Sequence, residues 1–138
     1  FICSNAIIPL MLNSKKGSIV NISSIAGINA LENRAAYMSS KWGLIGLASS
    51  LAIDFSPKNI RVNTICPGYV KTPLVNDYIN SLSNKSRNKL IKSHLIGRLG
   101  KPEDISQCAT FLLSSESSWI TGAVIPVDGG YTIGSNSK

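Results

Sequence analysis

The sequence predicts an α/β fold with a doubly wound parallel sheet, in which helices cover both faces of the sheet. Two short apolar runs, 18–23 and 60–66, are expected to be strands, and a long apolar helix over 35–56 lies between them. Such a strand–helix–strand unit crosses over right-handed and makes its two strands parallel. A later helix and strand within 100–127 would extend the same sheet.

Length and composition indicate one globular unit. The chain has 138 residues, so we treat 1–138 as part of a single domain, and its 43% hydrophobic and 15% charged residues can form a core. No apolar run reaches the roughly 18 residues of a membrane helix, so no membrane span is expected. The net charge of +7 comes from scattered basic residues without interleaved aromatics, which argues against nucleic-acid binding.

The cysteines and the histidine give little sign of a metal site. Cys3, Cys66 and Cys108 form no Cys-x-x-Cys motif and stand among apolar or small residues, so we expect buried thiols. Reduced thiols favour a reducing, cytoplasmic compartment. His94 lies in a polar segment and is expected at the surface or in a lid, rather than as a ligand or a base.

The first elements place a loop where ligands often bind. Apolar residues in 1–13 recur at helical spacing, and Pro9 predicts a kink or an early end of that helix. The strand over 18–23 is followed by the polar loop 24–33. In open α/β sheets, ligands bind beyond the carboxyl ends of the strands.

The helix over 35–56 has a broad apolar face that includes two glycines. Gly43 and Gly46 are poor helix formers, so their expected use is close packing against the sheet or a neighbouring subunit. After it, the strand 60–66 ends in the turn Pro67–Gly68, which would lie beside the loop 24–33.

The last part of the chain combines a polar excursion with a final helix and strand. Residues 74–99 are polar with weak helical periodicity, a composition typical of a lid over a site. Pro102 begins a helix that runs to about residue 113, and 123–127 is the last predicted strand. The tail after Tyr131 is expected to fray or to pack on a partner subunit.

Three side chains suggest proton transfer. Tyr37 and Lys41 are four residues apart and share one helix face, and Ser24 lies thirteen residues before Tyr37 in a loop that could return to it. A phenol beside a cation, with a second hydroxyl nearby, can protonate a carbonyl oxygen or deprotonate an alcohol. The Tyr-x-x-x-Lys pair alone is weak, because an interfacial tyrosine beside a solvated lysine also fits it.

The surroundings of this pair match a family pattern over nearly the whole chain. The segments are GSIVNISSIAG (17–27), YMSSK (37–41), IRVNTICPGYVKTP (60–73), GRLGKPEDIS (97–106) and ITGAVIPVDGG (120–130). Together they resemble the C-terminal half of a classical short-chain dehydrogenase/reductase, close to the 3-oxoacyl-carrier-protein reductases. The resemblance implies a Rossmann-type fold, here as a C-terminal fragment that lacks the N-terminal dinucleotide-binding half. The chain contains no glycine-rich phosphate loop.

The resemblance also implies an activity, a cofactor and an assembly. Family members use NAD or NADP to interconvert a secondary alcohol and a ketone, and they form homodimers or homotetramers. The resemblance assigns catalysis to Ser24, Tyr37 and Lys41. It assigns cofactor contacts to Tyr37, Lys41, Pro67, Gly68, Val70 and Thr72. The family's catalytic asparagine would precede Phe1.

Several alternatives stay open. Within the enzyme hypothesis, the substrate could be a 3-oxoacyl carrier-protein thioester, which the basic Lys85, Lys89 and Lys92 would favour, or a sugar or polyol. The three residues between Tyr37 and Lys41 argue against the enoyl-reductase branch, for which the resemblance would require six. The alternative from another class is an inactive fragment or a non-enzymatic binding or scaffold protein.

Overall fold

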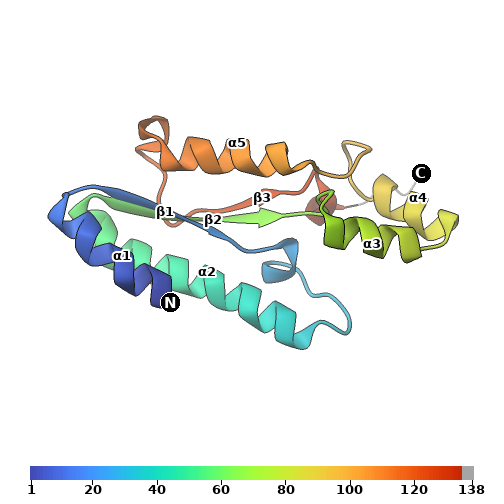
Figure 1. The fold of residues 1–138 in the computed structure, drawn as a ribbon, viewed down its shortest axis with the longest axis horizontal. Coiled ribbons are helices and arrows are strands. Elements are labelled where there is room, and N and C mark those ends of the chain that lie inside the picture. Colours follow the sequence, from blue (N-terminus) through green and yellow to red (C-terminus); the bar gives the residue numbers. More distant parts are fainter. Residues whose placement is uncertain (135–138) are drawn as a thin grey trace.

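A three-stranded parallel sheet forms the centre of the computed structural model, which describes residues 1–134 (Figure 1). Its strands are β1 (Gly17–Ile22), β2 (Ile60–Pro67) and β3 (Val124–Val127). β2 lies in the middle and pairs in parallel with both neighbours. The predicted α/β class is confirmed, and all three strands end at the same edge of the sheet.

Helices cover both faces of this sheet, as predicted (Figure 1). The helices are α1 (Ile2–Asn13), α2 (Ala35–Phe55), α3 (Pro73–Ser81), α4 (Asn84–Lys92) and α5 (Pro102–Leu113). α1 and α2 lie on one face and α5 on the other, whereas α3 and α4 lie beyond the carboxyl ends of the strands. Short 3-10 turns cover Ile25–Gly27, Ser56–Lys58, Ser115–Ser117 and Tyr131–Ile133.

The core is built around β2. Ile60, Val62, Ile65 and Cys66 are completely buried, as expected for a central parallel strand that is covered on both faces. Against Val62 pack Ile8 of α1 and three residues of α2, which are Ala48, Leu51 and Ala52. Burying one Val, Leu or Ile side chain stabilises the fold by about 1.5–3 kcal/mol, so this cluster fixes α2 on the sheet.

Two polar side chains of β2 hold the segment that connects α5 to β3. The Asn63 amide donates to the carbonyl oxygen of Ile120 at 2.9 Å and accepts from the N–H of Ala123 at 3.0 Å. The Arg61 guanidinium donates to the carbonyl oxygens of Leu112, Ser114 and Ile120. Because these carbonyls lie at a helix end and in a turn, the arginine satisfies groups that have no partner within a regular element.

Two local predictions differ from the structure. Of the kink or early end predicted at Pro9, the early end does not occur, because α1 continues to Asn13 with Ile8 buried against the sheet. Only Cys66 is a fully buried thiol. Cys3 is exposed and Cys108 is half-buried, since both lie on helix surfaces that turn away from the core.

The ends of the described chain add two observations. Residues 131–133 form a 3-10 turn, and the rest of the predicted tail, 135–138, lies outside the described residues. None of the helices within residues 1–134 has the length and apolar composition that a membrane crossing requires.

Candidate active site

The loop after β1 gives its two serines different environments. The Ser24 Oγ accepts a hydrogen bond from the N–H of Ala26 at 3.1 Å, which caps the turn Ile25–Gly27 and leaves the hydroxyl hydrogen available. The Ser23 hydroxyl is buried and donates to the carbonyl oxygen of Lys41 at 2.8 Å. Ser24 therefore faces the open edge of the sheet, and Ser23 faces the interior.

Tyr37 and Lys41 lie one turn apart near the start of α2, where the Tyr37 side chain is 48% exposed. The Lys41 Nζ donates to the carbonyl oxygen of Ile22 at 3.2 Å and lies 5.6 Å from the centre of the Tyr37 ring. The ammonium is thus tied to the end of β1, and it keeps a positive charge beside the phenol.

The turn after β2 is fixed by backbone hydrogen bonds. The N–H of Gly68 donates to the carbonyl oxygen of Val127. The N–H of Lys71 donates to the carbonyl oxygen of Gly100 at 2.9 Å, which links the turn to the start of α5. Gly68 has no room for a side chain, because a Cβ there would lie 2.9 Å from the Cα of Asp128. The Thr72 Oγ1 caps α3 through the N–H of Val75 and keeps its hydrogen available.

Two cavities meet between this turn and the Ser24 loop. The Thr72 cavity has about 470 Å³ and is lined by Ser24, Tyr37, Pro67, Gly68, Val70 and Thr72 together with apolar and small residues of β1, α3 and α5. The Tyr78 cavity has about 480 Å³ and shares Ser24, Tyr37 and Gly68 with it. Six of the seven predicted site residues therefore line one cavity, and Lys41, the seventh, lies behind Tyr37.

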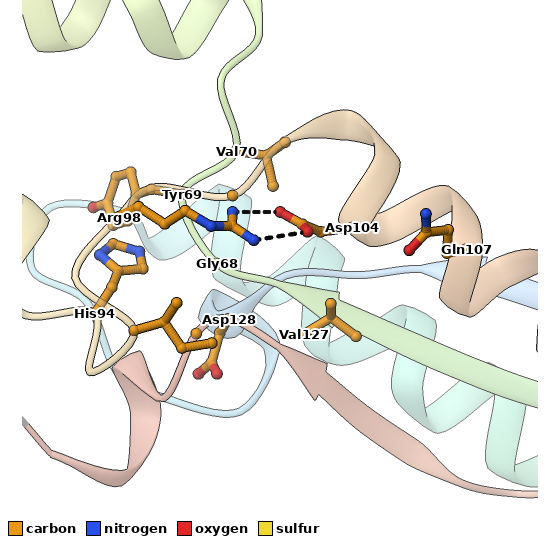
Figure 2. A pocket seen from close by; sticks show the side chains of 12 residues that line it. Gly68, Tyr69, Val70, His94, Arg98, Asp104, Gln107, Val127 and Asp128 are labelled. Carbon is orange, nitrogen blue, oxygen red and sulfur yellow. Dashed lines mark hydrogen bonds and ion pairs between the residues drawn. The ribbon is translucent and has the colours of Figure 1, made fainter.

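A third, smaller cavity of about 220 Å³, here called the Arg98 cavity, lies behind the turn (Figure 2). Figure 2 shows the Arg98 guanidinium facing the Asp104 carboxylate of α5, with which it forms hydrogen bonds of 2.7 and 3.0 Å. Arg98 holds the pKa of Asp104 well below its usual range. Burial raises the pKa of Asp128, but hydrogen bonds from Thr132 and Gly130 outweigh this and lower it. The charged groups of this cavity are thus paired with neighbouring protein groups.

The expected surface position of His94 is wrong. His94 is only 2% exposed, because its ring packs between Tyr69 and Tyr131 with centroid distances of 6.0 and 5.1 Å. Its Nδ1 bonds the carbonyl oxygen of Leu90 at 2.9 Å, and its Nε2 has no partner among residues 1–134. His94 thus helps to hold residues 74–99, the segment predicted as a lid, against the turn after β2.

Sequence reasoning missed part of the Tyr78 cavity. Its wall contains Tyr69 and Tyr78, whose rings stack at 6.3 Å, and its rim contains Arg34. Periodicity could not reveal the two tyrosines, since they come from different elements. Arg34 could have been found from the sequence, because it lies three residues before Tyr37 and so on the same side of the helix start. The part of the chain that the structure describes contains no group of three His, Cys, Asp or Glu suited to a metal ion.

Comparison with known proteins decides the family. A family model described as enoyl-(acyl carrier protein) reductase matches residues 1–132. The chain belongs to the short-chain dehydrogenase/reductase family. Cyclohexanol dehydrogenase of Acinetobacter sp. strain SE19 is 40% identical over 125 residues, which cover 91% of this chain and 47% of that protein. The 3-oxoacyl-[acyl-carrier-protein] reductase FabG of Thermotoga maritima is 39% identical, covering 96% of this chain and 52% of the relative.

Solved structures of short-chain dehydrogenases/reductases share the fold. A 4-hydroxyisoleucine dehydrogenase complexed with NADH superposes with a TM-score of 0.89 at 41% identity, covering 97% of this chain and 55% of that one. ElxO with NADP bound gives 0.86 at 32% identity, covering 95% and 52%. This chain spans about half the length of the curated relatives it matches.

Proposed function

We propose that the protein containing this chain is an NAD- or NADP-dependent oxidoreductase that interconverts a secondary alcohol and a ketone. The observation that carries the proposal is the meeting of the Ser24 and Tyr37 hydroxyls with the turn Pro67–Thr72 around one cavity. This cavity lies at the carboxyl edge of a parallel sheet, where such folds bind ligands. The relatives named above act on an alcohol or a 3-oxoacyl group, and the solved neighbours hold NADH or NADP.

The proton chemistry is assigned to three side chains. Tyr37 gives a proton to the ketone oxygen in reduction and takes it from the alcohol in oxidation. Lys41 supports this exchange because its ammonium, held by the carbonyl of Ile22, lies beside the phenol ring. The available hydrogen of Ser24 stabilises the substrate oxygen as negative charge develops on it.

The cofactor contacts are assigned to the Thr72 cavity. The nicotinamide part of the cofactor would lie along the turn Pro67–Gly68 and the backbone at Val70. The Thr72 hydroxyl would reach a phosphate oxygen of the cofactor. Lys41 would bind the ribose hydroxyls. The bare backbone of Gly68 fits this role, because a ligand can approach it closely. The nicotinamide supplies or accepts the hydride, while the chain provides placement and charge.

We assign the reaction to the interconversion of a ketone and an alcohol, and not to the reduction of an enoyl group. The matching family model carries the enoyl-reductase name, but only three residues separate Tyr37 from Lys41. The relatives reported above are named for an alcohol and a 3-oxoacyl substrate, which supports the same choice.

The proposal includes a homodimer or homotetramer in the cytoplasm. α2 leaves Trp42 and Ile53 exposed by 52% and 77%, and Trp119 before β3 is 98% exposed. Apolar groups of this size favour burial against another subunit. Gly43 and Gly46 leave open space on the same helix, which suits close helix packing. The three free thiols agree with a reducing compartment.

The test is Tyr37→Phe in the full-length protein, assayed with NADH and NADPH on a panel of ketones. Turnover should fall by about 10²–10⁴-fold because the proton donor is lost, while cofactor affinity in a fluorescence titration stays the same. Ser50→Ala, which removes an exposed hydroxyl of the same helix outside the two joined cavities, is the control. Retained turnover of Tyr37→Phe contradicts the proposal, and failure of the wild-type protein to bind either cofactor favours the non-enzymatic alternative.

A further inference from the structure

The Tyr78 cavity contains a single charged residue, Arg34. Within residues 1–134 its guanidinium makes no ion pair or hydrogen bond, whereas Arg98 is held by Asp104 in two bonds. Arg34 lies close enough to Tyr69 to oppose the rise in the pKa of that phenol, which burial causes. The exposed Arg34 guanidinium at the rim of the cavity is therefore available to bind an anion.

The walls of the cavity favour an apolar body in the ligand. The rings of Tyr69 and Tyr78 stack at 6.3 Å with an angle of 18° between their planes and form one flat side. Tyr69 is held from behind by His94 and Tyr131, so this side is pre-organised (Figure 2 shows Tyr69 and His94). The rest of the cavity wall is apolar and consists of Ile25, Leu31, Leu74 and Val75.

The distance between the cation and the reacting hydroxyls limits the ligand. Arg34 is the N-cap residue of α2, and its carbonyl oxygen accepts the first hydrogen bond of the helix, from the N–H of Met38 at 2.8 Å. Side chains three apart on a helix are neighbours, with roughly 5–6 Å between their Cβ atoms. Because Arg34, Tyr37 and Ser24 line the same cavity, one small ligand can meet the guanidinium and both hydroxyls.

From this arrangement we propose that the Tyr78 cavity selects small cyclic or branched ketones and secondary alcohols that carry a carboxylate, and that Arg34 binds the carboxylate. Arginine suits this role because its planar fork matches a carboxylate with two parallel hydrogen bonds. The cavity volume of about 480 Å³ is sufficient for a small ring. A carrier-protein thioester has no anion so close to its ketone, and it would leave Arg34 unused. This inference rests on the proposed function.

A kinetic comparison tests the role of Arg34. The full-length protein is assayed on 4-oxocyclohexanecarboxylate and on cyclohexanone, which differ by the anion. In Arg34→Gln the ratio of kcat/KM between acid and neutral ketone should fall about 10- to 100-fold, mainly through KM, because a charge-assisted hydrogen bond is lost. Arg34→Lys should restore part of the preference. Arg87→Gln, an exposed arginine on α4 outside the cavity, should keep the wild-type ratio.

A binding measurement separates this inference from the proposed reaction. Calorimetric titration compares cyclohexanecarboxylate with cyclohexanecarboxamide, neither of which has a ketone to reduce. Tighter binding of the carboxylate, lost in Arg34→Gln and kept in Arg87→Gln, supports the inference even if the protein turns over no ketone. Equal affinity for acid and amide in the wild-type protein, or an acid preference that survives in Arg34→Gln, overturns it and leaves the Tyr37 proposal standing.

Discussion

The charged groups on the two sides of the turn Pro67–Tyr69 differ in their pairing, although behind the turn the buried Nε2 of His94 also has no partner among residues 1–134. In front of the turn, Ser24 has an available hydrogen and Arg34 has no partner within the described residues. Behind it, Arg98 and Asp104 pair with each other, and Asp128 accepts three hydrogen bonds. Polar groups that only support a structure are satisfied internally, whereas groups that meet a ligand keep bonding capacity free.

The predictions below test this contrast, and the largest effect is expected for the two adjacent serines. Ser24→Ala should lower kcat by about 10²–10³-fold, because a donor to the developing oxyanion is removed. Ser23→Ala should instead lower the free energy of unfolding by about 0.5–1.5 kcal/mol, since the hydrogen bond that ties the Ser23 loop to the Lys41 carbonyl of α2 is lost. Steady-state kinetics and thermal unfolding of both variants measure this. A greater loss of turnover in Ser23→Ala would reverse the assignment.

The second prediction concerns the glycine that joins the two sides. Gly68→Ala should destabilise the protein by about 1–3 kcal/mol, because its Cβ would come within 3.2 Å of three Asp128 atoms, two of them backbone. The control is Gly43→Ala, where a Cβ meets nothing within 4 Å and alanine favours the helix. Chemical unfolding compares the two. Equal stability of Gly68→Ala and wild type would show that the turn is less closely supported from behind than the structure indicates.

The smallest effect is expected for the ion pair behind the turn. Because Arg98 lowers the pKa of Asp104 in the folded state, the pair stabilises the protein above the unfolded pKa of about 3.9. Asp104→Asn should therefore lower Tm at neutral pH, and the difference from wild type should shrink as the pH falls below about 4. Glu103→Gln, which changes an acid of the same turn that forms no ion pair within residues 1–134, is the control. A Tm difference that is constant with pH would contradict this role.

Much of the fold could be predicted because the sheet leaves a strong pattern. β2 is covered on both faces and therefore shows a nearly continuous apolar run, and the helices between the strands are long enough to show their own period. The expected burial of Cys3 was wrong, and α1 does not end at Pro9, because both outcomes depend on which helix surface meets the core. Local sequence does not contain that information.

The site could be predicted only in part, for a similar reason. The meeting of Ser24, Tyr37 and the turn at 67–72 follows from topology, since the carboxyl ends of parallel strands lie at one edge. The partners of His94 could not be predicted, because the tyrosines that bury it come from the turn after β2 and from the turn after β3. The weak helical periodicity of residues 74–99 did not indicate which side of α3 and α4 faces the Tyr78 cavity.

The bridge between Val70 and Gly100 has a consequence for how this protein can be altered. It brings together the two ends of a 71–99 excursion, which is also held to the turn after β3 by the His94 ring and by the N–H of Ile96, a donor to Gly129. The entropy of closing a loop changes only slowly with its length. An excursion from a relative, joined at these two anchors, should therefore be accepted as a cassette. Selectivity could then be exchanged while the sheet and the hydroxyls around Tyr37 keep their positions.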